Sequence, residues 1–321
     1  MKREISRESF PLKGTFAISR GARTHQDVLT LRLADGASRA WAECTPYGHN
    51  GETLDSVTAQ IESIAPEISR AELQDALPPG AARAAIDNAL WDLEAKQSGK
   101  RVWELMNLPA PKPVETAFTL SLASPEGMEE KAREAASMPL LKVKLGGDGD
   151  VARIEGVRRG VPNARIIVDA NEGWSVDQYL ELMPVFERLG IAMVEQPFKP
   201  DEDDVLLELP RPVPVCADEA CHTRADLPNL KGKYDFINIK MEKTGGLTEA
   251  LALRDAARAE GFKIMVGCMM GTSLGMAPGL IVAQGAEIVD LDGPLWMKRD
   301  RDNALKIDGQ GIHPPARQLW G

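Results

Sequence analysis

The pattern of apolar and polar positions changes about one third of the way along the chain. Before this point, strand-like runs at 27–33 and 38–44 precede helical patterns, of which the clearest covers residues 81–97. The segment LPAPKP that follows is predicted to be a linker, because its prolines disfavour both helix and sheet. The pattern therefore predicts two domains, an N-terminal α+β domain over 1–110 and a second domain over 111–321.

In the second domain, short apolar runs recur at intervals of 22 to 28 residues and alternate with amphipathic helical patterns such as 176–189 and 248–260. Strands that alternate with helices eight times are typical of a (β/α)8-type barrel, and a doubly wound parallel sheet is the alternative α/β fold. The apolar runs end near Leu122, Leu145, Asp169, Glu195, Asp218, Lys240, Cys268 and Asp292.

Composition and charge restrict the partners. The 321 residues include 48 acidic and 38 basic side chains, and the net charge of −10 argues against binding to nucleic acid. The four cysteines show no CxxC pair and no zinc-finger spacing; Cys216 and Cys221 could form a site, but buried thiols are the simpler interpretation. The N-terminus lacks an apolar signal segment, so a reduced cytoplasmic protein is expected. Residues 264–286 carry no charge, but Pro278, Gln284 and several glycines interrupt them. We predict buried barrel elements there and no membrane association.

Charged residues stand at the C-terminal ends of the predicted strands. Because side chains two residues apart on a strand share a face, these charges point to one side of the sheet. A single such residue could mark a strand that runs into a polar loop, but six strands with this feature indicate a common site. Barrel active sites lie at this end of the strands. The residues are Lys142, Lys144, Asp169, Glu195, Asp218, Lys240, Asp290 and Asp292.

Three of these acids predict a metal site. Asp169, Glu195 and Asp218 fall on the third, fourth and fifth predicted strands, which are neighbours in a barrel. Converging carboxylates repel one another, and a hard divalent cation such as Mg²⁺ relieves the repulsion while leaving positions open for water and substrate.

Two lysines predict acid/base chemistry. Lys144 is on the second predicted strand and Lys240 on the sixth, so that their ammonium groups would face each other across the barrel. We expect Lys142 to lower the pKa of Lys144 by like-charge repulsion, which would let Lys144 act as a general base. The alternative is that the lysines only neutralise the carboxylates.

The motifs LKVKL, IIVDAN, MVEQP, CADE and NIKMEKTGG resemble those of the enolase superfamily, in its muconate-lactonizing subgroup. The DLDGP segment is similar to the dipeptide epimerases within that subgroup, in particular those acting on L-Ala-D/L-Glu. The resemblance covers nearly the whole chain, including the ARAAIDNALWDLEAK helix. It implies a modified TIM barrel of the (β/α)7β type under an N-terminal α+β capping domain, to which the C-terminal tail contributes. It also implies one Mg²⁺ per subunit.

The resemblance implies a role for each candidate residue. The implied acid/base pair is Lys144 and Lys240, and the implied Mg²⁺ ligands are Asp169, Glu195 and Asp218. The implied substrate contacts are Asp290 and Asp292, which match a DxD pair that holds an α-ammonium, with Thr119, Lys142 and the cap residues Arg20 and Arg23. Beside the metal ligands, supporting roles are expected for Asn171 and Glu219.

These roles imply a Mg²⁺-dependent dipeptide epimerase, an isomerase that inverts the α-carbon of the C-terminal residue by 1,1-proton transfer through an enediolate. The expected substrate is L-Ala-D/L-Glu from peptidoglycan recycling. The alternatives are an epimerase of other dipeptides, an o-succinylbenzoate synthase, an N-acylamino-acid racemase and a non-catalytic barrel binding protein. The expected partner is the small dipeptide itself, and the sequence leaves a homo-oligomer open.

Overall fold

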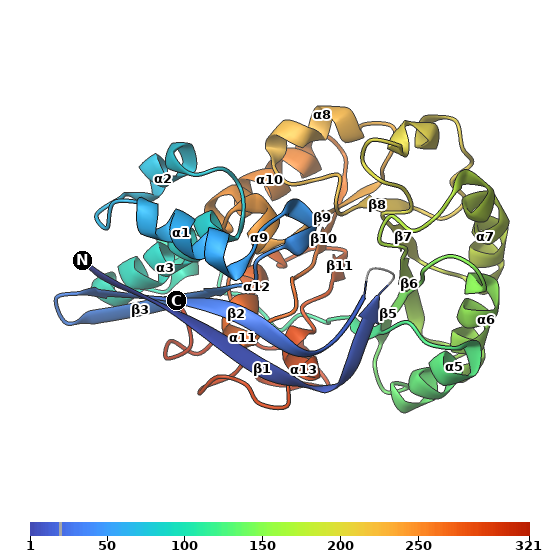
Figure 1. Cartoon of the computed structure of the whole chain (residues 1–321), viewed down its shortest axis with the longest axis horizontal. Helices are drawn as coiled ribbons and strands as arrows, with labels where there is room; N and C mark the ends of the chain where they lie inside the picture. The colour runs from blue at the N-terminus through green and yellow to red at the C-terminus, as the bar shows by residue number, and fades with distance from the viewer. Residues whose placement is uncertain (19–20) are drawn as a thin grey trace.

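The computed structural model describes residues 1–18 and 21–321 (Figure 1). The N-terminal part is an antiparallel sheet with helices packed on one face, as its alternating strand patterns and later helical patterns predict. Its strands are β1 (Lys2–Ile18), β2 (Gly21–Asp35) and β3 (Ser38–Cys44). Its helices are α1 (Leu54–Ser63), α2 (Arg70–Ala76), α3 (Ala81–Ser98) and α4 (Val102–Leu105).

Eight parallel strands follow in a curled sheet whose spatial order is the order of the chain. They are β4 (Phe118–Leu120), β5 (Leu140–Lys144), β6 (Arg165–Asp169), β7 (Met193–Glu195), β8 (Val215–Ala217), β9 (Phe236–Ile239), β10 (Lys263–Val266) and β11 (Ile288–Val289). A hydrogen bond links the two edge strands, because Ala117 N, just before β4, donates to Val289 O of β11 at 2.8 Å. This arrangement, with the N-terminal antiparallel sheet, confirms the predicted α/β barrel fold.

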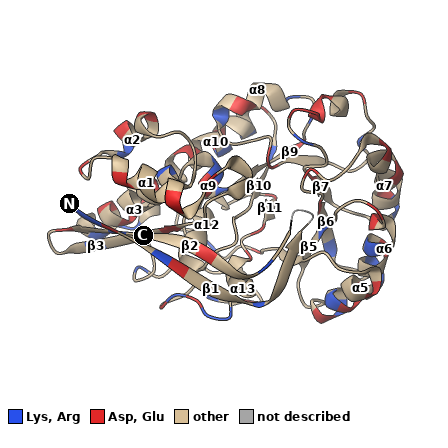
Figure 2. Ribbon diagram, in the orientation of Figure 1, with Lys and Arg blue, Asp and Glu red and all other residues tan. Residues whose placement is uncertain are grey.

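Helical segments fill the seven connections between these strands. The longest are α5 (Pro125–Glu134), α6 (Asp150–Gly160), α7 (Val176–Leu189) and α10 (Leu247–Ala259). The shorter ones are α8 (Leu227–Leu230), α9 (Met241–Thr244), α11 (Ser273–Met276) and α12 (Gly279–Val282), and only a 3-10 turn at Asp203–Leu207 lies between β7 and β8. Acidic and basic residues both occur along the outer helices α5, α6 and α7 (Figure 2), and most of them there are exposed or half-buried. Much of the charge is therefore at the surface, where it favours solubility.

The charge-free stretch 264–286 lies inside the barrel wall. It comprises β10, a loop, and the buried helices α11 and α12. In the part of the chain that the structure describes, no helix has the length and apolar character needed to cross a bilayer.

The C-terminal tail packs against α3. It follows α13 (Gly293–Trp296) and the short strands β12 (Ile307–Asp308) and β13 (Gly311–Ile312). Gly321 N donates to Asp92 Oδ1 at 2.7 Å, and Trp320 Nε1 donates to Asn88 O at 3.1 Å. Trp320 is fully buried, so the tail joins the hydrophobic core instead of lying loose on the surface.

Candidate active site

One apolar side chain from each barrel strand, or from the residue just before it, forms a floor inside the barrel. The floor comprises Ala117, Leu140, Ile167, Met193, Cys216, Phe236, Met265 and Ile288, all buried. Because strand side chains alternate, the residue two positions further on points to the same interior face, one layer higher. Leu140 is thus followed by Lys142, and Ile167 by Asp169. The alternation predicted from the sequence lifts every candidate charge above this floor, toward the open end.

Lys142 lies at the centre of the acidic groups. Its Nζ is 2.8 Å from Glu195 Oε2, 3.0 Å from Asp169 Oδ2 and 2.9 Å from Asp290 Oδ2. Burial disfavours the charged amine, but the carboxylates outweigh burial and raise the pKa of Lys142 well above its usual value. Lys142 is therefore held as an ammonium whose charge three carboxylates compensate.

Lys144 and Lys240 approach the site from β5 and from the residue after β9, on opposite sides of the curled sheet. Lys144 Nζ donates to Asp169 Oδ2 at 2.5 Å and to Asn171 Oδ1 at 3.0 Å, and Lys240 Nζ donates to Asp218 Oδ2 at 2.6 Å. Burial opposes the charge of Lys240, but Asp218 raises the pKa of this lysine overall. Each lysine thus pairs with a carboxylate and also faces the shared cavity.

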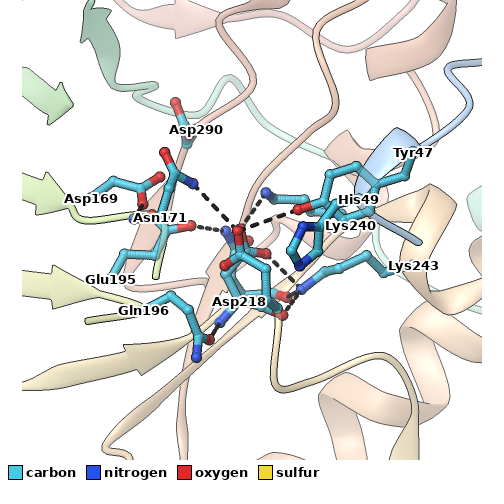
Figure 3. A network of polar contacts seen from close by, with 12 residues as sticks. Tyr47, His49, Asp169, Asn171, Glu195, Gln196, Asp218, Lys240, Lys243 and Asp290 are labelled. Carbon is cyan, nitrogen blue, oxygen red and sulfur yellow. Dashed lines mark hydrogen bonds and ion pairs between the residues drawn. The ribbon is translucent and has the colours of Figure 1, made fainter. Parts of the chain in front are cut away.

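Several polar residues that the sequence analysis did not assign hold these groups in place (Figure 3). Asn238 donates to Glu195 Oε1 at 2.7 Å, and the Gln196 side-chain oxygen accepts from Asp218 N at 2.8 Å. Lys243 Nζ lies 2.7 Å from Asp218 Oδ1 and donates to Asn238 O at 2.8 Å. Asn238 and Lys243 belong to the quoted run from Asn238 to Gly246, and Gln196 to MVEQP, so the signal lay within the motifs.

The expected supporting residues are brought together. Asn171 N donates to Asp169 Oδ1 at 2.9 Å, and Asn171 Nδ2 donates to Glu219 Oε1 at 3.4 Å. Asn171 has a φ of 45°, in the left-handed region, where an asparagine is tolerated better than most residues. This turn aims its side chain back at Lys144 and Glu219.

The three acids are chemically suited to a divalent cation, although lysines stand between them. Among residues 1–18 and 21–321, no three His, Cys, Asp or Glu side chains form a ready cluster of ligands. However, Glu195 Oε2 and Asp218 Oδ1 are buried and accept no hydrogen bond, despite the ammonium groups nearby. Burial and the charge of Asp169 raise the pKa of Glu195 to about 8. Each of the two oxygens pairs with an ammonium group instead of accepting a directed hydrogen bond, and a hard cation could take the place of that positive charge. The chemistry of Asp169, Glu195 and Asp218 therefore fits such a cation.

Asp290 and Asp292 face the same cavity from the last strand. Asp290 already accepts an ammonium, that of Lys142, at 2.9 Å. Asp292 Oδ2 accepts from the backbone N of Thr119 at 2.7 Å, and Thr119 also lines the cavity. Burial and the neighbouring Asp290 raise the pKa of Asp292 to about 7. Two buried carboxylates with this much negative potential would favour a second, substrate-borne ammonium.

The N-terminal domain covers the open end of the barrel. Arg23 lines the cavity, and its Nη1 donates to Gln26 Oε1 at 2.8 Å, whereas Arg20 lies outside the described residues. Tyr47 donates to Glu219 Oε1 at 3.3 Å, and a ring nitrogen of His49 lies 3.2 Å from Glu172 Oε1. The loop after β3 therefore contacts the barrel directly beside Lys240 (Figure 3).

An eight-stranded barrel with opposed lysines, an acidic cluster and a covering α+β domain defines an enzyme of the enolase superfamily. The model for "Enolase C-terminal domain-like" proteins matches residues 127–317, and that for the "Mandelate racemase / muconate lactonizing enzyme, N-terminal domain" matches residues 2–107. The chain belongs to this mandelate racemase and muconate lactonizing enzyme family, which confirms the resemblance noted from its motifs.

Two curated relatives align over nearly the whole chain. The L-Ala-D/L-Glu epimerase of Escherichia coli (strain K12) is 41% identical, over 97% of this chain and 98% of its own length. The N-acetyl-D-glutamate racemase of a Pseudoalteromonas species is 40% identical, over 92% and 95% respectively. Both relatives are racemases or epimerases, and the prediction of an isomerase is confirmed.

Two solved structures show the same fold with ligands. An enolase-family member from Agrobacterium tumefaciens, with homology to dipeptide epimerases, contains sodium and L-Ala-L-Glu. It is 48% identical, each chain is 99% covered, and the TM-score is 0.97. A dipeptide epimerase from Methylococcus capsulatus, complexed with Mg and L-Arg-D-Lys, is 28% identical over 99% of this chain and 98% of its own, with a TM-score of 0.90. Metal ions in these related structures agree with the expected Mg²⁺ cofactor.

Proposed function

We propose that this protein is a dipeptide epimerase that inverts the α-carbon of the C-terminal residue, with L-Ala-D/L-Glu as its substrate. The observation that carries the proposal is the combination of Lys144 and Lys240 on opposite sides of one cavity with Asp290 and Asp292 at its end. The lysines supply proton transfer on two faces, and the aspartates supply a site for a free α-ammonium. A dipeptide with a free N-terminus matches both.

Inversion requires two groups on opposite sides of the α-carbon, one to remove a proton and one to deliver a proton. One lysine removes the α-proton as a neutral amine, and the other delivers a proton to the opposite face as an ammonium. The contact with Asp218 favours the ammonium form of Lys240, which is the form that delivers a proton. In the reverse direction Lys240 has to leave this contact before it can accept one.

The substrate carboxylate would be bound at the acidic cluster. Asp169, Glu195 and Asp218 would hold a Mg²⁺ ion, which when bound supplies charge neutralisation for the carboxylate as the α-proton leaves. Asn238 and Gln196 orient this cluster through the hydrogen bonds described above, and the buried setting excludes water that would weaken the electrostatic interactions.

The N-terminal domain would select the substrate. We assign residues 1–110, with the C-terminal tail, to a capping domain and residues 111–321 to the catalytic barrel. Arg23 is the described cationic residue of the cap that lines the cavity, and its guanidinium could pair with the side-chain carboxylate of a glutamate. Because L-Ala-D-Glu is a unit of peptidoglycan peptides, we place the reaction in their recycling, in the cytoplasm.

An N-acylamino-acid racemase is the main competing function, because the same lysines would serve and one relative racemises N-acetyl-D-glutamate. Its substrates, like those of o-succinylbenzoate synthase, carry no α-ammonium. Asp290 and Asp292 would then be two buried carboxylates without a substrate partner, which is energetically costly. The aspartate pair therefore favours the dipeptide.

A direct test is incubation of a dipeptide library in D₂O with Mg²⁺, with mass spectrometry to detect the gain of one deuterium at the α-carbon. We expect labelling of Xaa-Glu dipeptides, with L-Ala-L-Glu among the fastest. N-acetylglutamate and N-succinyl amino acids are the matched controls without an ammonium. Labelling of the N-acyl compounds alone would refute the proposal.

A further inference from the structure

Residues at the end of β3 form hydrogen bonds to one barrel loop at two positions. The loop, residues 267–272, connects β10 to α11. Thr45 Oγ1 donates to Met270 O at 2.9 Å, and Glu43 accepts from Thr272 N at 2.7 Å and from Thr272 Oγ1 at 2.5 Å. Glu43 and Thr45 are two residues apart, so an extended chain presents them on one face. The N-terminal domain thus fixes the far half of this loop.

Glu43 is itself held by a buried ion pair. It is 3% exposed, and Arg301, between α13 and β12, donates to Glu43 Oε2 through Nη2 at 2.6 Å and through Nε at 3.1 Å. Arg301 also donates to Thr30 Oγ1 at 2.8 Å and pairs with Glu8. Apolar side chains would fill such a space at a lower desolvation cost. The ion pair between Arg301 and Glu43 instead fixes the position of the Glu43 carboxylate, and thereby that of Thr272.

Close packing at Gly271 and Gly293 links the position of Glu43 to the position of the cavity wall. A Cβ at Gly271 would lie 2.8 Å from Glu43 Oε1, and a Cβ at Gly293 would lie 2.6 Å from Gly271 O. Gly293 directly follows Asp292. The contacts therefore run without a gap from Glu43 through Gly271 to the residue that follows the aspartate pair, and closely packed groups have little room to adjust.

The loop at residues 267–272 forms one wall of the cavity. Cys268, Met269 and Met270 line it together with Asp290 and Asp292. Asp290 N donates to Val266 O at 2.8 Å, which places the start of the loop beside the aspartates. A side chain on the residue that carries the α-ammonium would meet this wall, so the position of the wall limits its size.

We propose that Glu43 is a positioning residue that sets the selectivity for the first residue of the dipeptide, by holding the Cys268–Met270 wall close enough to admit a small side chain and disfavour a large one. This inference rests on the proposed dipeptide epimerase function. Glu43 acts through Thr272 and Gly271, and Thr45 supports the same wall through Met270.

The test compares Glu43→Gln with Glu8→Gln. Both variants remove one carboxylate partner of Arg301, which also donates to Thr272 Oγ1 at 3.1 Å, but only Glu43→Gln changes an acceptor that Thr272 contacts directly. Thr272→Val removes the hydroxyl that donates to Glu43 and that also accepts from Leu274 N at the start of α11, so Glu43→Gln is the decisive variant. Thr272→Ser keeps both contacts. The measurements are kcat and KM for Gly-Glu, Ala-Glu, Val-Glu and Leu-Glu, and hydrogen–deuterium exchange of the peptide covering 267–276.

For Glu43→Gln and Thr272→Val we expect faster amide exchange in residues 267–276. We also expect the KM for Ala-Glu to rise about tenfold, because one hydrogen bond to a charged group is lost. The kcat should stay within about threefold of the wild-type value. The preference for Ala-Glu over Leu-Glu should fall by about tenfold. Glu8→Gln and Thr272→Ser should keep the wild-type preference and exchange. A general loss of stability would instead affect Glu8→Gln as well and would leave the preference unchanged.

Wild-type preference in both Glu43→Gln and Thr272→Val would overturn the inference, as would unchanged exchange of 267–276 in both. If the wild-type protein labelled no dipeptide, the proposed function would fail, and with it the selectivity that rests on it. The exchange measurement would then still decide whether Glu43 holds the loop.

Discussion

At the residue scale, each buried lysine of the site meets a carboxylate, whereas the buried Asp292 accepts a hydrogen bond from the backbone N of Thr119. Lys142 contacts three carboxylates, Lys144 contacts Asp169, and Lys240 contacts Asp218. Removing one member leaves a buried, uncompensated charge on its neighbour, which is costly in a low-dielectric interior. Substitutions here therefore need conservative controls that separate chemistry from folding.

The first prediction concerns the opposed lysines. Lys144→Ala and Lys240→Ala should each lower the rate of epimerisation by roughly 10² to 10⁴-fold, as for removal of a general acid or base. Chiral chromatography of L-Ala-L-Glu after incubation measures this loss. Mass spectrometry in D₂O should show α-proton exchange from only one epimer in at least one variant. Epimerisation at the wild-type rate in either would rule out the two-base assignment, and Lys263→Ala, at the exposed start of β10, is the control.

The second prediction concerns the ammonium site. Asp292→Asn keeps an oxygen that can accept from Thr119 N but removes the negative charge. We expect KM for L-Ala-L-Glu to rise about 10- to 100-fold, which corresponds to about 1.5 to 3 kcal/mol for a hydrogen bond to a charged group. Any exchange of N-acetylglutamate, measured in parallel by deuterium labelling, should not be weakened. An equal loss for both substrates would mean that Asp292 does not bind the ammonium.

At the element scale, α3 supplies the cap that α10 lacks. The residue before α10 is Gly246, which has no side chain with which to accept from the first amide groups. Asn88 Oδ1 accepts from Leu247 N at 3.0 Å, and Asp87 Oδ2 accepts from Thr248 N at 2.9 Å. A helix of the N-terminal domain thereby caps a helix of the barrel. This contact fixes the segment that directly follows Lys240.

The third prediction tests this docking with two glycines. Gly246 has a φ of 113°, and a Cβ there would lie 2.5 Å from Asp87 Oδ2. Gly99, after α3, has a φ of 72° and open space around its Cβ position. Gly99→Ala should cost about 1 kcal/mol from backbone strain alone, whereas Gly246→Ala should cost at least about 3 kcal/mol. Urea unfolding measures both, and equal costs would contradict the docking described here.

At the scale of the whole molecule, the two parts of the chain are joined through buried acids. Glu242, at the start of the segment after β9, accepts from Thr45 N at 3.2 Å. Burial raises the pKa of Glu242 to about 7, and Glu52 and Glu43 add to this effect, although backbone hydrogen bonds oppose it. The folded protein therefore favours the protonated form of Glu242 more than the unfolded chain does.

The fourth prediction is a pH dependence of stability. Because the pKa of Glu242 is higher in the folded state, this group stabilises the fold less as pH rises from about 4.5 to about 7. The shift corresponds to about 3 kcal/mol in the free energy of unfolding. Glu242→Gln keeps an oxygen for Thr45 N and should remove this part of the pH dependence, seen by urea unfolding at pH 5 and pH 8. An identical dependence in the variant and the wild type would contradict the assignment.

The sequence predicted the long elements closely, because their periodicity is local. The pattern at 81–97 corresponds to α3, Ala81–Ser98, and the pattern at 176–189 matches α7. Strand parity also placed Lys144, Asp169 and the other charged residues on one face. Both results depend only on neighbours along the chain, which a single sequence displays.

Contacts between distant segments could not be predicted in this way. The sequence placed Lys142 in the site, but it could not show that the ammonium lies among Asp169, Glu195 and Asp290. Their distances depend on how the curled sheet closes, which no local pattern encodes.

The sequence by itself determined which side chains share the barrel interior, because a strand repeats every two residues and its C-terminal end carries the charge. The surroundings of these side chains depend on how distant segments pack. The contacts of Asn238 with Glu195, of Glu43 with Thr272 and of α3 with α10 join segments far apart in the chain. Such contacts depend on three-dimensional packing and on the pairing of buried charges, and these arise only when the whole chain folds.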